Sequence, residues 1–215
     1  MSADYAPPTD PLDIIEDDHE LLFVNKPPGL LSVPGKGEHL ADCLISRVQL
    51  VFPQALLVHR LDRDTSGVMV FALTHHAQRH LGLQFEKRQT KKVYVARVWG
   101  QMEDNQGTVD LPIAADWPNR PLQKIDHENG RQAITGWKVL RRKPDETRVR
   151  LYPHTGRSHQ LRVHMKALGH PILGDPFYAE GSAADAPRLM LHAESLKLRH
   201  PDGGRGVIAK AKAPF

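Results

Sequence analysis

The sequence predicts one domain of mixed helix and strand content, in which strands outnumber helices. Strand-like apolar segments alternate with helix-like ones along the chain, and the sequence has no obvious internal repeat. The 215 residues are enough to bury roughly 70% of the unfolded surface. A hydrophobic fraction of 40% and a charged fraction of 25% are typical of globular proteins. We therefore expect residues 1–215 to form one interleaved domain, with residues 1–11 as a flexible tail.

Composition excludes several classes of protein. Cys43 is the only cysteine, which rules out an internal disulfide framework and any zinc or iron-sulfur site built from several cysteines. No segment approaches the roughly 20 apolar residues that cross a bilayer, and the first residues lack the pattern of a signal peptide. We expect a soluble cytoplasmic protein. The net charge of +4 and the pI near 9.2 fit an attraction to phosphate, and equally a soluble protein with a slightly basic surface.

The first half of the chain predicts a hairpin, two helices and a buried strand. Residues 12–15 and 21–24 are strand-like and are separated by a polar turn. Apolar residues at positions 40, 44 and 48 predict a helix that ends before Pro53. Residues 68–73 form a continuous apolar run, as in a central strand. Thr74 can cap a following helix whose buried stripe contains Ala77, Leu81 and Phe85.

The second half predicts more strands and one short helix. Residues 93–99 alternate as in a strand, which places Tyr94 on the face opposite Arg97. Further strands are expected at residues 108–111, 133–140, 148–152, 189–193 and 207–209. Residues 158–169 predict a helix with Ser158 as N-cap, Gly169 as stop and a buried stripe at positions 161, 165 and 168. Arg162 lies one position off that stripe, where a guanidinium can point into a cleft or remain solvated.

The densest polar cluster is the segment His-Arg-Leu-Asp-Arg-Asp-Thr-Ser-Gly at residues 59–67, directly before the predicted buried strand. Loops at strand ends on a rigid sheet often carry chemistry, and this one offers carboxylates, cations and hydroxyls. The same residues would also suit a turn that is only stabilised by local hydrogen bonds.

This segment resembles the signature of the RluA family of pseudouridine synthases, in which the aspartate after Arg-Leu is catalytic; here that residue is Asp62. Residues 91–96 (KKVYVA) resemble the tyrosine motif of the family, and residues 154–164 (HTGRSHQLRVH) its arginine motif. Residues 191–193 resemble its closing strand, and residues 25–27 and 169–175 also fit. The resemblance spans roughly residues 12–215 in the expected order.

The resemblance implies an α+β fold, with a mixed, mostly antiparallel sheet flanked by helices and a central RNA-binding cleft. It implies a single catalytic domain, since the chain is too short to carry the N-terminal S4-like RNA-binding domain of many relatives. The segment DWPNRP at residues 116–121 strengthens the likeness to the compact, dual-specificity members of the family. That likeness implies two substrates, a 23S ribosomal RNA hairpin and a tRNA anticodon stem-loop. We expect a monomer that binds RNA and no membrane.

The resemblance also implies roles for individual residues. Asp62 is the catalytic carboxylate, Arg162 the cation that keeps it ionised, and Tyr94 the ring that stacks on or flanks the target uracil. Arg60 occupies the space vacated by the flipped base. Leu191 supports the active site. The cations and the histidine expected to contact RNA are His59, Lys87, Arg88, Lys91, Lys92 and Arg157. The isomerisation involves neither oxidation nor hydrolysis, so we expect no cofactor and no metal.

Several alternatives remain open at this stage. The chain could be a non-catalytic RNA-binding module, although such a module has no need for Asp62, Tyr94 and Arg162 together. Asp62 and Asp64 could be a glycosidase carboxylate pair, but two residues in one turn seldom flank a sugar. Arg60 could form a salt bridge with Asp64. The histidines at positions 154, 159 and 164 are spaced by five, unlike a helical metal pair.

Overall fold

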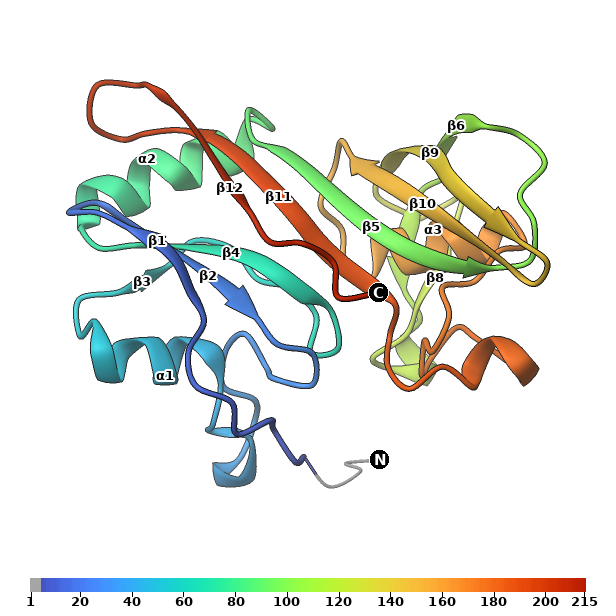
Figure 1. The fold of residues 1–215 in the computed structure, drawn as a ribbon, viewed down its shortest axis with the longest axis horizontal. Helices are drawn as coiled ribbons and strands as arrows, with labels where there is room; N and C mark the ends of the chain where they lie inside the picture. The colour runs from blue at the N-terminus through green and yellow to red at the C-terminus, as the bar shows by residue number, and fades with distance from the viewer. Residues whose placement is uncertain (1–4) are drawn as a thin grey trace. The chain divides into compact units, whose positions relative to one another are not determined.

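The computed structural model describes residues 5–215, which group into two compact units (Figure 1). The first unit contains residues up to 92 and residues 193–214, and the second contains residues 93–192 and Phe215. The chain leaves the first unit within β5 (Lys91–Trp99) and returns to it within β11 (Leu191–Arg199). Each unit is described by itself. The expectation of one interleaved domain stays a prediction.

The first unit is built on a sheet in the order β1-β2-β4-β11-β12, in which β3 also pairs with β4. The predicted hairpin is confirmed as β1 (Ile14–Asp17) and β2 (Leu21–Lys26), and the predicted buried strand as β4 (Ser66–Ala72), whose residues are all buried. β3 (Leu56–Leu57) was not predicted. β12 (Gly206–Lys210) pairs with β11 as the last strand. The β1-β2, β2-β4, β3-β4 and β11-β12 pairs are antiparallel.

Helices lie on opposite sides of this sheet, as Figure 1 shows for α1 (Leu44–Val51) and α2 (His75–Glu86). The Thr74 side chain accepts a hydrogen bond from the N–H of Ala77 at 3.0 Å, so the predicted N-cap of α2 is confirmed. α2 buries Ala77 and Leu81 against one face of β2 and β4. The first predicted helix begins later than expected, because residues 38–40 form a short 3-10 turn before α1.

The second unit contains a four-stranded antiparallel sheet in the order β5-β10-β9-β6. Its further strands are β6 (Gln106–Asp110), β9 (Ile134–Lys143) and β10 (Glu146–Pro153), each within a few residues of its predicted range. A separate hairpin of β7 (Ile113–Ala115) and β8 (Gln123–Ile125) was not predicted. Together the two units confirm the α+β class with a mostly antiparallel sheet flanked by helices.

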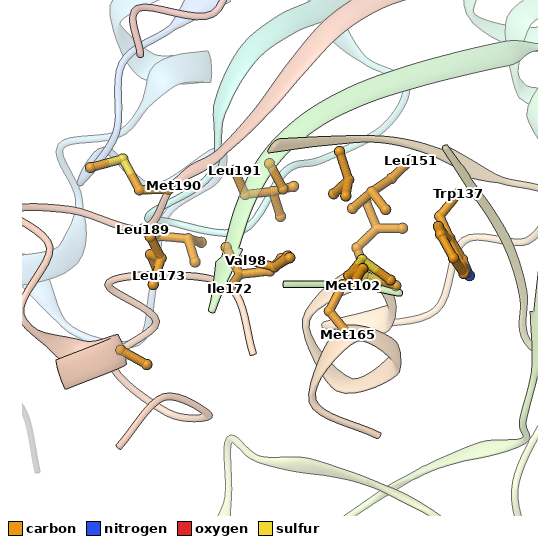
Figure 2. Packing of buried hydrophobic residues seen from close by; sticks show 14 of the residues in the cluster. Val98, Met102, Trp137, Leu151, Met165, Ile172, Leu173, Leu189, Met190 and Leu191 are labelled. Atoms are coloured by element: carbon orange, nitrogen blue, oxygen red, sulfur yellow. The ribbon is translucent and has the colours of Figure 1, made fainter. Parts of the chain in front are cut away.

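One face of the second sheet carries the hydrophobic core that holds α3 (Gln160–Ala167) in place. Figure 2 shows this cluster, in which Leu161 and Met165 from α3 meet residues of β5, β9, β10 and the segment before β11. Side chains of β5 alternate, so Tyr94, Ala96 and Val98 face this core. The opposite face of β5 therefore presents Arg97.

The helix predicted for residues 158–169 is shorter than expected and begins differently. His159 is its N-cap, in a left-handed conformation with φ 52°, so the prediction of Ser158 as N-cap is wrong. Leu168 is 37% exposed, so it is not part of the buried stripe as predicted. Gly169, at φ +82°, donates its N–H to the carbonyl of Lys166 at 2.9 Å and ends the helix as predicted.

The predicted flexible tail lies partly outside the described residues, which begin at Tyr5. Residues 5–11 have no regular secondary structure, yet Tyr5 is anchored to the first unit. Its hydroxyl donates to the carbonyl of Asp42 at 2.8 Å and accepts from the N–H of Leu31 at 3.0 Å. Among the residues that the structure describes, no helix is long and apolar enough to cross a membrane.

Candidate active site

Asp62 lies in a tight turn that leads directly into β4. Its carbonyl accepts the N–H of Thr65 at 3.2 Å, and its side chain is half-buried. An aspartate at the first position is typical of such turns. The turn is followed by Gly67 at φ +114°, where a side chain would collide with the backbone of Ala193 in β11. A glycine is therefore required at this position, and it lets the turn and the strand run closely beside β11.

Two side chains, Lys26 at the end of β2 and Ser32 in the segment after it, fix the backbone on both sides of Asp62. The Ser32 hydroxyl donates to the carbonyl of Leu61 at 2.7 Å and accepts the N–H of the same residue at 3.1 Å. The Lys26 ammonium is fully buried and donates to the carbonyl of Arg63 at 2.7 Å. It also donates to the carbonyls of Pro27 and Leu30, at 2.9 and 2.6 Å. The residues before and after Asp62 are therefore held by hydrogen bonds from Ser32 and Lys26, which fix the backbone on both sides of it.

The neighbouring charges in this turn have distinct surroundings. Arg60 is exposed. The carboxylate of Asp64 is bound by Arg63, from Nε to Oδ1 at 2.9 Å and from Nη2 to Oδ2 at 3.2 Å. The alternative of an Arg60 salt bridge to Asp64 is therefore not what the structure shows. Arg60 therefore lies on the protein surface, two residues before Asp62 in the sequence.

His59 is held by the sheet. Its Nε2 accepts the N–H of Val70 in β4 at 3.0 Å. The ring thus provides an acceptor for β4 next to the two residues that pair with β3. The ring also stacks on Phe85, with a centroid distance of 4.7 Å. Burial, and to a lesser degree the positive charge of Lys92, lowers the pKa of His59 from 6.5 to about 3. The neutral imidazole carries its proton on Nδ1 and brings no charge to a phosphate; its predicted RNA contact stays a prediction.

The predicted basic run follows α2. Lys87 is the C-cap of that helix, and Arg88 has the left-handed φ of 56° that turns the chain toward β5. Lys87, Arg88 and Lys91 are exposed, whereas Lys92 is half-buried. Burial lowers the pKa of Lys92 below its ordinary value. Three cations of the run are thus open to an anionic ligand, and the fourth is partly withdrawn.

In the second unit Arg162 is a buried cation in a fixed position. Its side chain is 2% exposed and forms a two-pronged pair with Asp175, which is 0% exposed. Nε donates to Oδ2 at 2.7 Å and Nη2 donates to Oδ1 at 2.6 Å. This geometry matches the planar guanidinium to the planar carboxylate. The carboxylate neutralises the buried cation and fixes the plane of the guanidinium.

Asp175 is in turn held by the segment that follows it. Its Oδ1 accepts the N–H groups of Phe177 and Tyr178 at 2.9 and 3.2 Å. The rings of these two residues lie 5.2 and 5.1 Å from the guanidinium carbon of Arg162. The Tyr178 hydroxyl is hydrogen-bonded to Nδ1 of His159 at 2.7 Å, which ties this segment to the start of α3. The guanidinium of Arg162 is therefore flanked by one carboxylate and two aromatic rings.

The remaining predicted residues of this unit lie on strands or at the start of α3. Tyr94 is half-buried and packs against the core cluster that contains Leu191. Leu191 is 3% exposed and begins β11 (Figure 2). Arg157 is half-buried, and its Nε donates to the carbonyl of Gln132 at 3.0 Å. Tyr94 and Leu191 are thus brought to one cluster, whereas Arg157 is engaged by a loop.

Two histidines of the predicted arginine motif, His159 and His164, have hydrogen-bond partners within the second unit. His164 is buried, with Nδ1 at 2.9 Å from the Thr135 hydroxyl and Nε2 at 3.0 Å from the carbonyl of Leu111. Burial lowers its pKa, although the bond to Leu111 partly opposes this. Within the described part of the chain, no three His, Cys, Asp or Glu residues are grouped so that they could hold a metal ion.

The structure thus divides the predicted site between the two units. His59, Arg60, Asp62 and the basic run lie in the first unit, and Tyr94, Arg157, Arg162 and Leu191 lie in the second. Sequence reasoning missed the supporting residues Lys26, Ser32 and Asp175. A signal for two of them was present, because Lys26 and Asp175 lie within segments that resemble family motifs. Nothing in the sequence marked Ser32.

Comparisons with known proteins identify the family of the chain. A family model described as RNA pseudouridylate synthase matches residues 20–167. The dual-specificity RNA pseudouridine synthase RluA of Escherichia coli K12 is 55% identical over 98% of both chains. The protein of the same name from Yersinia pestis is 52% identical, over 94% of this chain and 99% of its own.

Two solved human structures are also similar. RNA pseudouridylate synthase domain containing 1 is 30% identical with a TM-score of 0.82, and the match covers 98% of this chain and 87% of the human chain. RNA pseudouridylate synthase domain containing 4 is 26% identical with a TM-score of 0.76, covering 94% and 88%. The likeness therefore extends over nearly the whole chain in both sequence and fold.

Proposed function

Because this chain belongs to the RNA pseudouridylate synthase family, and is an isomerase that converts uridine to pseudouridine in RNA, we propose that Asp62 is its catalytic carboxylate. The observation that carries the proposal is the clamp around Asp62, since Lys26 and Ser32 bind the backbone of its two neighbours. A turn that only connected two strands would have no need of a fully buried lysine. The carboxylate is instead preorganised, as catalysis requires.

We also propose two substrates, a hairpin of 23S ribosomal RNA and a tRNA anticodon stem-loop. The support is the name of the relatives, which are called dual-specificity enzymes in Escherichia coli and Yersinia pestis and match this chain over nearly its full length. The net charge of +4 suits an RNA substrate. The expectation of a monomeric, cytoplasmic protein stays a prediction.

The chemistry requires one ionised carboxylate beside the sugar. Isomerisation breaks the bond between N1 of the uracil and C1′ of the ribose, turns the base, and forms a bond from C5 to the same C1′. The proton on C5 is lost and N1 gains one, so atoms and electrons balance without any co-reactant. Asp62 can act as nucleophile or as proton acceptor, and either role needs the charged form. No step of this reaction calls for a metal or a redox cofactor.

Arg162 is the cation that we propose for Asp62. An opposite charge nearby favours the ionised form of a carboxylate. The two-pronged pair with Asp175 fixes the plane of the guanidinium. Because the guanidinium is already held in place, Arg162 can act as a positioned cation with little further loss of side-chain freedom.

Tyr94 and Arg60 complete the proposed site. A half-buried tyrosine on a strand is a rigid platform, and stacking of a base on such a ring is worth about 1–3 kcal/mol. Arg60 is exposed on the turn that carries Asp62, so its long side chain can enter the space that the base leaves. Extruding a nucleotide costs a few kcal/mol, and contacts from both residues offset that cost.

The test uses two aspartates of the same turn. Wild type, Asp62→Asn and the matched control Asp64→Asn are incubated with the anticodon stem-loop and the ribosomal hairpin, and pseudouridine is mapped by its alkali-resistant carbodiimide adduct. We expect wild type and Asp64→Asn to convert both RNAs, because Asp64 is only paired with Arg63. Asp62→Asn should bind RNA within a few-fold of wild type and form no product.

Each other outcome removes a defined part of the proposal. Activity in Asp62→Asn at the wild-type level removes this residue from the mechanism. Wild-type conversion of one RNA alone removes the dual specificity. Binding of both RNAs by the wild type without conversion would favour the non-catalytic RNA-binding module.

A further inference from the structure

Three arginines form a row across the second sheet. Arg97 of β5 is directly opposite Arg148 of β10, and Arg148 is directly opposite Arg141 of β9. Two residues along β10, Arg150 is opposite Lys138. Like charges directly opposite each other destabilise a sheet. This arrangement therefore costs stability unless an anion binds to it.

The register that aligns this row depends on an irregularity in β9. Between Arg148 and Val149 the pairing shifts by one residue, so that Arg141 and Val139 face consecutive residues of β10. Such a bulge re-aims side chains. It brings Arg141 and Lys138 to the same face, although they are three apart on their strand.

One carboxylate, that of Glu146, forms ion pairs with two of the neighbouring cations. Glu146 accepts hydrogen bonds from Nε and Nη2 of Arg97, and its other oxygen lies 2.8 Å from the Lys143 ammonium. Burial alone would raise the pKa of Glu146, but the bonds from Arg97 and Lys143 lower it, so the carboxylate is ionised. Nε of Arg148 is buried and has no hydrogen-bond partner among the described residues. A buried donor without a partner is costly and invites an acceptor.

The cations surround a hollow of about 110 Å³, lined by Arg97, Arg141, Lys143, Glu146, Arg148 and Phe215. One water needs roughly 10–15 Å³ by a comparable measure, so the hollow admits a group the size of a phosphate. The four cationic side chains and the one carboxylate side chain of the lining have a net side-chain charge of +3. The hollow therefore favours an anion by both its size and its charge.

The hollow is distinct from the proposed active site. Arg97 and Tyr94 are three residues apart on β5, and side chains of a strand alternate, so they face opposite sides of the sheet. Tyr94 packs on the core side, and Arg97 lines the hollow. A ligand on the arginine row would not occupy the position proposed for the target uracil.

We propose that the arginine row, Arg97, Arg148 and Arg141 with Lys138 beside it, binds phosphates of the RNA backbone outside the stem-loop that carries the target uridine. The proposal rests on the proposed function only in taking RNA as the ligand. Arginine forks match phosphate oxygens, and such contacts position an RNA without reading its sequence. The row would let one enzyme hold two different RNAs that share little beyond a stem-loop.

The test compares a bare anticodon stem-loop with the full-length tRNA transcript. The double variant Lys138→Gln/Arg141→Gln removes two exposed cations of the row and leaves the proposed active site intact. The matched control, Lys197→Gln/Lys210→Gln, removes two exposed lysines from β11 and β12. Affinity is measured by fluorescence anisotropy between about 50 and 200 mM salt, the range over which phosphate contacts weaken strongly. Conversion at saturating RNA is measured in parallel.

For the full-length tRNA we expect the row variant to bind several-fold more weakly. The slope of log affinity against log salt should become shallower by about 1.5, since each phosphate contact contributes roughly 0.7–0.9. Binding of the bare stem-loop and conversion of both RNAs at saturation should equal wild type. The control should match wild type in every measurement.

An unchanged slope for the full-length tRNA would overturn the proposal. So would an equal loss in the control, which would show an effect of net charge, or an equal loss with the bare stem-loop, which would place the contact within the stem-loop. Failure of the wild type to form pseudouridine would instead refute the proposed function, and the binding comparison would still decide the role of the arginine row.

Discussion

Replacing Lys26 by methionine should both destabilise the protein and slow its reaction. Methionine has a similar length but no N–H donors, so the substitution opens little space and removes three hydrogen bonds. The carbonyl of Arg63 still accepts a second hydrogen bond in the variant, from the N–H of Gly29 at 3.0 Å. The carbonyls of Pro27 and Leu30 are left without another donor among the described residues.

The magnitude follows from these two carbonyls. A buried acceptor without a partner costs about 1–3 kcal/mol, which applies in full to the buried Leu30 and only in part to the half-buried Pro27. Removing the buried charge of Lys26 offsets part of this loss of stability, because burying an ammonium group is itself unfavourable. We therefore expect the free energy of unfolding to fall by about 1–3 kcal/mol. A shift of about 1 Å at Asp62 would in addition lower kcat by about 100-fold.

Urea unfolding followed by circular dichroism measures the first effect, and single-turnover conversion of the anticodon stem-loop measures the second. Lys197→Met, at an exposed position of β11, is the control and should change stability by less than about 0.5 kcal/mol. A Lys26→Met protein as stable as this control would refute the clamp. Lost stability with an unchanged kcat would show that the clamp does not position Asp62.

Two further predictions concern buried groups. Asp175→Asn removes the charged partner of the buried pair with Arg162, so the free energy of unfolding should fall by about 3–5 kcal/mol in urea unfolding; a fall below about 1 kcal/mol would contradict the importance of this pair. Because folding lowers the pKa of His59 from 6.5 to about 3, the unfolded chain binds the extra proton between these pH values. Its stabilising contribution is complete above about pH 6.5 and is lost as the pH falls toward 3, by at most about 1.4 kcal/mol per pH unit. His59→Gln keeps an acceptor for Val70 and should flatten the curve of stability against pH in this window, whereas an unchanged slope would show that His59 does not cause it.

Local features of the fold could be predicted from the sequence with good accuracy. The apolar run before Thr74 identified β4, and Thr74 itself identified the start of α2, because an N-cap bonds to residues only three positions away. The alternation of β5 placed Tyr94 opposite Arg97. These predictions succeeded because each depends on neighbours within a few residues.

The supporting contacts of the site could not be predicted in this way. The bond from Lys26 to Arg63 joins residues 37 positions apart, and the pair of Arg162 with Asp175 joins residues 13 apart across a turn. Which carbonyl or carboxylate a buried cation meets depends on how the loops close, and periodicity carries no information on this. The left-handed conformation of His159 was equally hidden, because a non-glycine residue at positive φ leaves no mark in the local pattern.

The alignment of the arginine row was hidden for a related reason. Periodicity assigns Arg141 and Lys138 to opposite faces of a regular strand. The bulge in β9 brings them to one face, and only the pairing with β10 reveals it.

The route of the chain through its two units has a consequence for biosynthesis. The ribosome releases the chain from its N-terminus, so β4 emerges long before β11, the neighbour that completes its sheet. The 118 residues of positions 73–190 lie between them, which corresponds to roughly 6–24 s of elongation at about 5–20 residues per second. During that interval one edge of β4, a mostly apolar strand that is fully buried in the folded protein, has no partner on the nascent chain. The last 22 residues of the first unit, 193–214, therefore act as the closing piece, and a protein truncated before them would present an open edge prone to aggregation.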